Sequence, residues 1–291
     1  MFVENTRRCI ICGDTKPVSF FNKEHIIPDA LGNKTLFFYQ TCTDCNSNLG
    51  REIDVHLTDN LLMKLIRCQL GLKSQNGIIP NPFSKGTDEA GKEIKVTDDF
   101  RPFRNSYIEK DGEHWRISAQ TLDESLKIAE KALKRAGKND DEIKRILADG
   151  RHKHIQETPT ISYTVAIDLQ KIKLAILKIA YEYSCHKFGD AYFNDKTAQI
   201  IRGILHKASK AIEFVDYEDM GYIPDEIYSL LAKLKNMGSH CLFFVRDKDN
   251  RLILQVLLFF QQTFSYGIVV SNNATKYDCF LHDPVEFVGK H

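Results

Sequence analysis

The sequence EHIIPDALGN, residues 24–33, places a Glu-His pair between two Cys-x-x-Cys motifs. CIIC precedes it at Cys9 and Cys12, and CTDC follows it at Cys42 and Cys45. A Cys-x-x-Cys turn directs two sulfurs at one point, and two such turns complete the four-thiolate tetrahedron that structural zinc prefers. We therefore predict that these four cysteines bind a zinc ion. Because four thiolates leave no open coordination position, this zinc would be structural.

A thiol oxidoreductase is an alternative use of Cys-x-x-Cys, and it predicts two reactive pairs without bound zinc. The N-terminal sequence MFVENTRR lacks an apolar signal core, so we expect a cytoplasmic protein. In that compartment, paired Cys-x-x-Cys motifs indicate metal binding rather than disulfides. No run of 18 apolar residues occurs, and we expect no membrane span.

The overall charge gives no general attraction to nucleic acid. The 291 residues carry a net charge of +1, with 43% hydrophobic and 27% charged residues, as in an ordinary globular protein. Residues 1–60 hold six Lys/Arg and eight Asp/Glu, so this segment is slightly acidic. Since phosphate contacts dominate DNA affinity, binding would need a metal ion, the rest of the chain or a partner.

The residue pattern predicts an α+β fold in three parts. Residues 1–75 form a cysteine-marked module with a trailing helix. Residues 76–90 form a linker, which begins with the Asn-, Gly- and Pro-rich NGIIPNPFSKG. Residues 91–291 form a larger α+β accessory domain.

Periodicity predicts the individual elements. Helical spacing indicates helices over 58–70 (with Thr58 as a candidate N-cap), 122–149 with a break near 137–140, 168–189, 195–211 and 224–235. β-branched and aromatic runs indicate strands within 92–118 and over 161–167, 240–247, 251–260, 264–271 and 275–282. We expect the last four strands to form an antiparallel sheet packed on the 168–189 helix. Lys171, Lys173 and Lys178 are predicted to form the solvated face of that helix.

Glu24, His25 and Asn46 together suggest phosphodiester hydrolysis. A histidine near its ordinary pKa can take a proton from water at neutral pH. A carboxylate and an amide oxygen are hard ligands suited to Mg²⁺ or Mn²⁺, which stabilises charge on a phosphoryl transition state. Residues 24–28 and 37–42 would form a hairpin, and the following helix would carry Asn46 near its start.

Together these motifs, C-x-x-C, E-H-I-I-P-x-x-L-G and C-x-x-C-N-x-x-x-G-x-x-I-D, resemble the HNH endonuclease family and, more narrowly, a zinc-knuckle subgroup of bacterial nucleases. The resemblance covers roughly residues 7–57. It implies a zinc-bound ββα-metal (HNH) module that hydrolyses DNA. It further implies His25 as general base, with Glu24 and Asn46 as ligands of the catalytic Mg²⁺ or Mn²⁺.

One family position departs from the pattern. The resemblance places an asparagine that orients the base histidine at the position of Phe37. Asn33, Thr35 or Gln40 could take that role instead. Asp54 matches the trailing Ile-Asp of the subgroup, either as a structural residue or as a distal metal ligand.

The sequence leaves several alternatives open. His25 could be a buried histidine bonded to a carbonyl, Glu24 could face solvent, and Asn46 could cap its helix. The leading hypothesis is an HNH endonuclease that nicks or cuts DNA, with partners in a bacterial anti-phage defence or restriction system by family analogy. Residues 91–291 would then serve targeting, sensing or homodimerisation. The rival is a non-catalytic, zinc-stabilised nucleic-acid-binding or interaction module.

Overall fold

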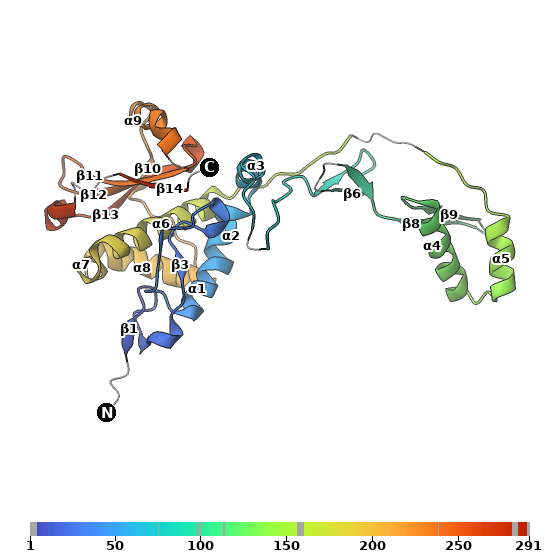
Figure 1. The fold of residues 1–291 in the computed structure, drawn as a ribbon, viewed down its shortest axis with the longest axis horizontal. Helices are drawn as coiled ribbons and strands as arrows, with labels where there is room; N and C mark the ends of the chain where they lie inside the picture. Colours follow the sequence, from blue (N-terminus) through green and yellow to red (C-terminus); the bar gives the residue numbers. More distant parts are fainter. Residues whose placement is uncertain are drawn as a thin grey trace. The chain divides into compact units, whose positions relative to one another are not determined.

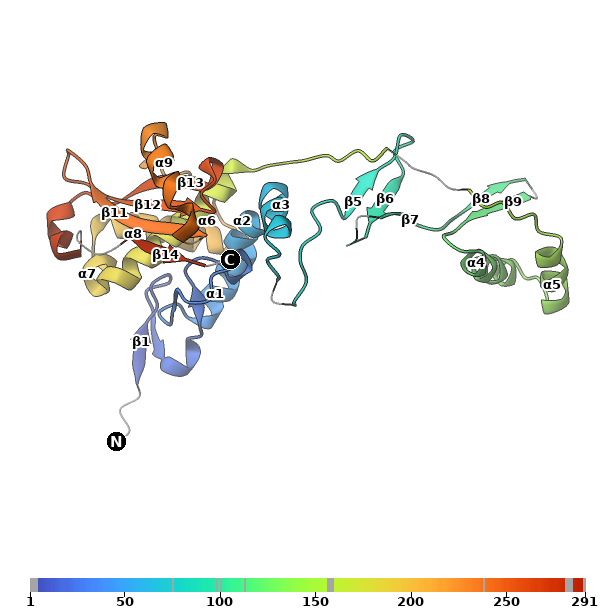
Figure 2. The same ribbon diagram turned by 45° about the horizontal axis from the view of Figure 1, so that its top comes forward.

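A computed structural model describes residues 5–74, 76–97, 99, 101–112, 114–155, 160–237, 239–280 and 285–289. The chain divides into two compact units (Figures 1 and 2). One unit combines residues 1–80 with 167–291, and the other consists of residues 81–166. These units differ from the sequence-based division at 76–90 because the long helix after residue 167 packs against the N-terminal segment.

The N-terminal segment contains short strands followed by nearly continuous helix. Asn60, rather than the predicted Thr58, caps the last helix by accepting a hydrogen bond from the backbone N–H of Met63. The elements are β1 Thr6–Arg8, β2 Thr15–Pro17, β3 Glu24–His25, β4 Phe37–Phe38, α1 Thr43–Leu49, a π-helical turn Gly50–Asp54, α2 Val55–Thr58 and α3 Leu61–Gln69. Single-turn 3₁₀ helices occur at Val18–Phe20 and Asp29–Leu31.

Helix α6 (Leu169–Phe188) is the centre of this unit. Its residues are buried on nearly every side, because it contacts the C-terminal sheet as well as α2 and the π-helical turn (Figure 1). The periodicity that predicted 168–189 is therefore confirmed as a helix. The prediction that Lys178 belongs to a solvated face is wrong, since its side chain is fully buried.

The C-terminal sheet is antiparallel, with strand order β10-β13-β12-β11-β14, and it packs on α6 as predicted. Three of the four predicted strands are present. The fourth, 275–282, is wrong: Ala274–Phe280 forms 3₁₀ turns on either side of a kink at Tyr277, which is buried against Phe188, and residues 281–282 lie outside the described part. The strands are β10 Met220–Tyr222, β11 His240–Arg246, β12 Leu252–Leu258, β13 Ser265–Ser271 and β14 Glu286–Val288. The remaining helices are α7 Asp190–Phe193, α8 Lys196–Ser209, α9 Asp225–Leu231 and the 3₁₀ segments Ala232–Met237 and Gln262–Phe264.

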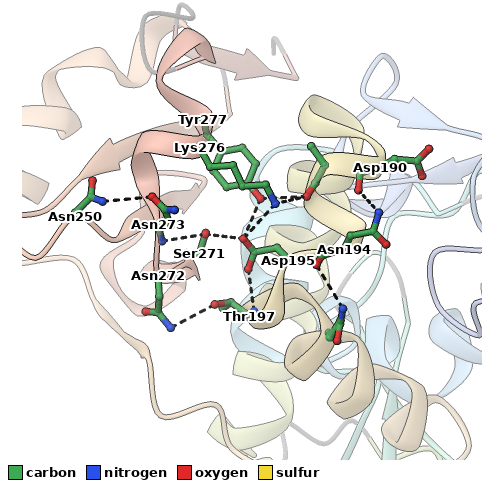
Figure 3. Close-up of polar contacts among 12 residues, drawn as sticks. Asp190, Asn194, Asp195, Thr197, Asn250, Ser271, Asn272, Asn273, Lys276 and Tyr277 are labelled. Carbon is green, nitrogen blue, oxygen red and sulfur yellow. Dashed lines mark hydrogen bonds and ion pairs between the residues drawn. The ribbon is translucent and has the colours of Figure 1, made fainter.

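A buried carboxylate fastens α8 to this sheet (Figure 3). Asp195 caps α8 by accepting a hydrogen bond from the Thr197 N–H at 2.9 Å. Its other oxygen accepts from the Ser271 hydroxyl at 2.8 Å and the Tyr277 hydroxyl at 3.0 Å. The network explains why the segment after β13 turns back over α7 and α8 instead of continuing as a strand.

The second unit consists of small sheets and a helical pair. The strands β5 Lys85–Thr87, β6 Glu93–Val96 and β7 Pro102–Arg104 form one sheet, and β8 Tyr107–Asp111 pairs with β9 His114–Ser118. Helices α4 (Leu122–Arg135) and α5 (Asp140–Ala148) follow, the second opened by a capping box of Asn139 and Glu142. The predicted strand 161–167 is reduced to one bridge between Thr87 and Ser162. In the described part of the chain, no helix has the length and apolar character to cross a membrane.

Candidate metal centre and active site

The four knuckle cysteines converge on one point. Their Sγ atoms all lie within 4.8 Å of one another, in agreement with a tetrahedron whose 2.3 Å metal–sulfur bonds place the sulfurs about 3.8 Å apart. The turn with Cys9 and Cys12 is joined to the start of α1, because the Cys42 N–H points to Cys9 Sγ at 3.4 Å. The residues therefore fit a structural zinc ion. Within the described ranges, no other group of three or more His, Cys, Asp or Glu side chains converges in this way.

The electrostatics of the thiols also favour a cation. A hydrogen bond with Cys45 lowers the pKa of Cys9 to about 4, and the same bond raises the pKa of Cys45. Burial raises the pKa of Cys12 to about 12. The pKa shifts of Cys9, Cys12 and Cys45 arise from their mutual contacts and burial, and a divalent ion bound among the four cysteines would stabilise all of them as thiolates. Lys16 Nζ lies 3.5 Å from Cys42 Sγ, where it would offset the net negative charge of a zinc tetrathiolate.

The insert between the knuckles forms a hairpin at the predicted place, but its strands are Glu24–His25 and Phe37–Phe38, shorter than the predicted 24–28 and 37–42. Glu24 pairs with Phe38 and His25 with Phe37 in antiparallel register. Neighbouring residues of a strand point to opposite faces. Glu24 is accordingly turned into the core, with 4% of its surface exposed, while His25 lies on the opposite, half-buried face.

Asn33 holds the loop between these strands. Its side chain is fully buried and donates to the carbonyl oxygens of Ile27, at 2.6 Å, and Leu36, at 2.7 Å. Its amide oxygen accepts from the N–H groups of Leu36 and Thr35. These bonds engage both ends of the amide, so Asn33 serves the loop backbone.

His25 is held by packing rather than by a hydrogen bond at Nδ1. That atom is buried without a hydrogen-bond partner, and Asp29 Oδ1 lies 3.7 Å away. The ring packs against Phe37 with 6.0 Å between centroids. Burial and the nearby Lys23 lower the pKa of His25, which keeps the imidazole neutral at pH 7. A neutral imidazole is the form that can accept a proton.

Asn46 lies in the second turn of α1 and does not cap it, since Cys42 occupies the N-cap position. Its amide nitrogen donates to Asn22 Oδ1 at 2.9 Å and to the Lys23 carbonyl oxygen at 3.0 Å. Asn46 thus fastens the helix to the chain just before β3. The amide oxygen is the atom through which it would bind a hard cation.

Glu24 belongs to a buried cluster around the ammonium of Lys178, here called the Lys178 cluster. Lys178 Nζ bonds to Glu24 Oε1 and lies 2.9 Å from Asp54 Oδ2 and 3.4 Å from Glu182 Oε2. Although burial opposes its charge, the carboxylates of Asp54, Glu182 and Glu24 raise the pKa of Lys178 well above its usual value. Burial raises the pKa values of Glu24 and Glu182. The cluster is therefore acid-rich, and burial favours a protonated Glu182.

The three predicted active-site residues consequently make different contacts. His25 packs on Phe37, and Asn46 donates to the chain just before β3. Glu24 forms an ion pair with the Lys178 ammonium. The amide of Asn46 fits a hard divalent cation. The carboxylate of Glu24 fits one only in competition with Lys178.

Lys178 and Glu182 were not predicted as members of this site, although the sequence around them carries one signal of it. Leu174, Ala175 and Tyr181 surround Lys178 at helical spacings of three and four, with Glu182 as the only polar neighbour. A lysine within an apolar stretch whose i+4 neighbour is acidic indicates a buried pair.

Comparison with known proteins places this geometry in context. Residues 9–62 match the family model described as HNH endonuclease. The N-terminal segment therefore carries an HNH endonuclease domain with a four-cysteine cluster, and the predicted resemblance is confirmed. No curated protein and no solved structure matched the chain in these comparisons.

Proposed function

We propose that the protein is a metal-dependent endonuclease that hydrolyses DNA phosphodiester bonds with His25 as general base. The observation that supports this most directly is the position of His25, half-buried on the outer face of the hairpin within the segment that matches the HNH endonuclease family model. In this scheme, His25 removes a proton from the water that attacks phosphorus. The packing of Phe37 limits the motion of the ring.

A divalent cation, Mg²⁺ or Mn²⁺, would be held by Asn46 and Glu24 and would neutralise charge on the phosphate and the leaving oxygen. The HNH-like sequence motif supports both Glu24 and Asn46 as ligands. The amide of Asn46, on α1, is in addition a donor type that fits a hard cation. At Glu24 the cation would compete with the Lys178 ammonium. Asp54, bonded to the same ammonium, acts as a structural residue in this proposal.

A single active site cuts one strand at a time, so nicking is the expected activity of a monomer and double-strand cleavage that of a homodimer. The remainder of the first unit and residues 81–166 would serve targeting, sensing or dimerisation. Family analogy alone supports a cytoplasmic role in a bacterial anti-phage defence or restriction system.

The test is a plasmid-nicking assay with the full chain in Mg²⁺ or Mn²⁺. Wild-type protein should convert supercoiled plasmid to the nicked form, and His25→Ala should abolish this conversion. His114→Ala, which removes an exposed histidine of the other unit, is the matched control and should keep activity.

The rival is a non-catalytic, zinc-stabilised DNA-binding module. Phe37 in place of an orienting asparagine and the engagement of Glu24 with Lys178 favour it. Plasmid binding without nicking in either metal, by wild type and His25→Ala alike, would support this rival against the nuclease.

A further inference from the structure

Three rings form a row beside the candidate base, here called the aromatic row: His25, Phe37 and Tyr39. Phe37 lies opposite His25 in the hairpin, and Tyr39 follows two residues later along the same chain. The centroids of His25 and Phe37 are 6.0 Å apart, and those of Phe37 and Tyr39 are also 6.0 Å apart, in an edge-to-face arrangement. The row therefore leads outward from the imidazole without interruption.

Exposure increases along the aromatic row. His25 and Phe37 are half-buried, whereas Tyr39 is 47% exposed. Phe37 lies between the other two rings of the row. The ammonium of Lys23 also lies against it, with Nζ 3.9 Å from the ring centroid. Tyr39 contacts Phe37 edge to face, and its exposed surface is the part of the row that a ligand can reach.

Positive charge flanks the aromatic row. Lys23 is exposed, and in the described part of the chain it has no carboxylate partner. On the Tyr39 side, the Arg7 guanidinium donates to the Tyr39 carbonyl oxygen. Lys34, with 68% of its side chain exposed, carries a further ammonium beside Asp29 and His25. Cations beside exposed rings match a ligand that combines phosphates with flat bases.

We propose that Tyr39 is the stacking platform for an unpaired base next to the scissile phosphate, so that the substrate is single-stranded DNA. This inference rests on the proposed nuclease function and specifies its substrate. In a duplex the faces of the bases are already stacked on one another, and an exposed ring can stack only on a base that is unpaired. The acidic excess in residues 1–60 also limits phosphate contacts, which makes stacking the larger source of affinity.

The experiment measures binding by fluorescence anisotropy, with the full-length wild-type protein and without added divalent metal, so that all three rings of the aromatic row are present and the proposed metal-dependent cleavage does not occur. The probes are a fluorescein-labelled mixed-sequence oligonucleotide and its blunt duplex at one salt concentration. Tyr39→Phe keeps the aromatic face, and Tyr39→Leu keeps apolar bulk without it. Tyr222→Leu removes a tyrosine of similar exposure, 51%, from the C-terminal sheet as control.

The single strand should bind more tightly than the duplex. Tyr39→Leu should weaken single-strand binding about 5- to 150-fold, the loss expected for one base stack, while Tyr39→Phe and Tyr222→Leu change it less than about 2-fold. Equal binding of the two probes, no binding of either, or equal effects of Tyr39→Leu and Tyr222→Leu would overturn the proposal. Because binding is measured without divalent metal, these outcomes are independent of whether the chain nicks plasmid.

Discussion

The ammonium of Lys178 and the carboxylate of Asp54 lie 2.9 Å apart although 124 residues separate them in the chain. Lys178 also bonds to Glu24, which lies 154 residues away in the chain. These contacts join the hairpin, the π-helical turn Gly50–Asp54 and α6 at one buried point. Charges removed from water are costly unless each has a partner, so the three elements are bound to a single arrangement. The fold of the HNH domain thus depends on a residue in the second half of the sequence.

Lys178→Met should destabilise the protein strongly. The substitution keeps the length of the side chain but leaves buried carboxylates without a cation, and such a loss costs about 3–5 kcal/mol. Urea denaturation followed by circular dichroism at pH 7 measures the change in free energy of unfolding.

Glu182→Gln is the comparison within the same cluster, because Glu182 is buried one turn along α6 with its Oε2 3.4 Å from Lys178 Nζ but makes no hydrogen bond with its carboxylate oxygens. Since burial already favours its neutral form, the amide should cost less than about 1 kcal/mol. Equal losses from Lys178→Met and Glu182→Gln would contradict the assignment of Lys178 as the central cation.

Asn33→Ala should destabilise the hairpin by more than about 2 kcal/mol. The substitution leaves the carbonyl oxygens of Ile27 and Leu36 without a donor inside the core, and each buried unsatisfied group costs about 1–3 kcal/mol. Asn5→Ala, at an exposed site of the same segment, should cost less than about 0.5 kcal/mol. Thermal denaturation of the two variants side by side provides the comparison, and equal melting temperatures would refute the role given to Asn33.

Local features of the fold could be predicted from the sequence. The knuckle spacing identified Cys9, Cys12, Cys42 and Cys45, and the apolar periodicity identified the 168–189 helix, because both signals lie within short stretches. The α+β class with a C-terminal antiparallel sheet is likewise confirmed.

Features that depend on distant contacts could not be predicted. Lysine side chains normally lie at the surface, and only the approach of Glu24 and Asp54 makes the burial of Lys178 favourable. Tyr277 lies in a strand-like run, but its bond to Asp195 and its packing on Phe188 hold the segment as 3₁₀ turns with a kink at Tyr277. Tertiary contacts overrode the surface preference of lysine in the first case and the strand propensity of the segment in the second.

Zinc removal gives a direct test of the cysteine site. The purified chain should contain about one zinc ion, measured by plasma mass spectrometry, and Cys45→Ser should lose it because three thiolates hold zinc less tightly than four. Cys68→Ser, which removes a partly buried cysteine outside the cluster, should keep the full zinc content. Full zinc occupancy in Cys45→Ser would show that this sulfur is not a ligand.

Stability should fall on mild acidification, and His56 should account for part of the loss. Burial, assisted by the nearby Lys171 and opposed by Asp168 and Glu52, lowers the pKa of His56 below its ordinary value of 6.5. The unfolded chain therefore binds a proton at a higher pH than the folded chain. Stability is then complete above pH 6.5 and decreases as the pH falls through the ordinary value toward the lowered one.

His56→Gln removes this titration, so the free energy of unfolding should differ less between about pH 7.5 and 5.5 than in the wild type. The substitution also removes the ring contact with Phe214, but it does so at both pH values, and comparing each variant with itself cancels that loss. His154→Gln, at an exposed position, should keep the wild-type difference. If His56→Gln shows the same pH dependence as the wild type in urea denaturation, His56 is not one of the groups whose protonation drives acid unfolding.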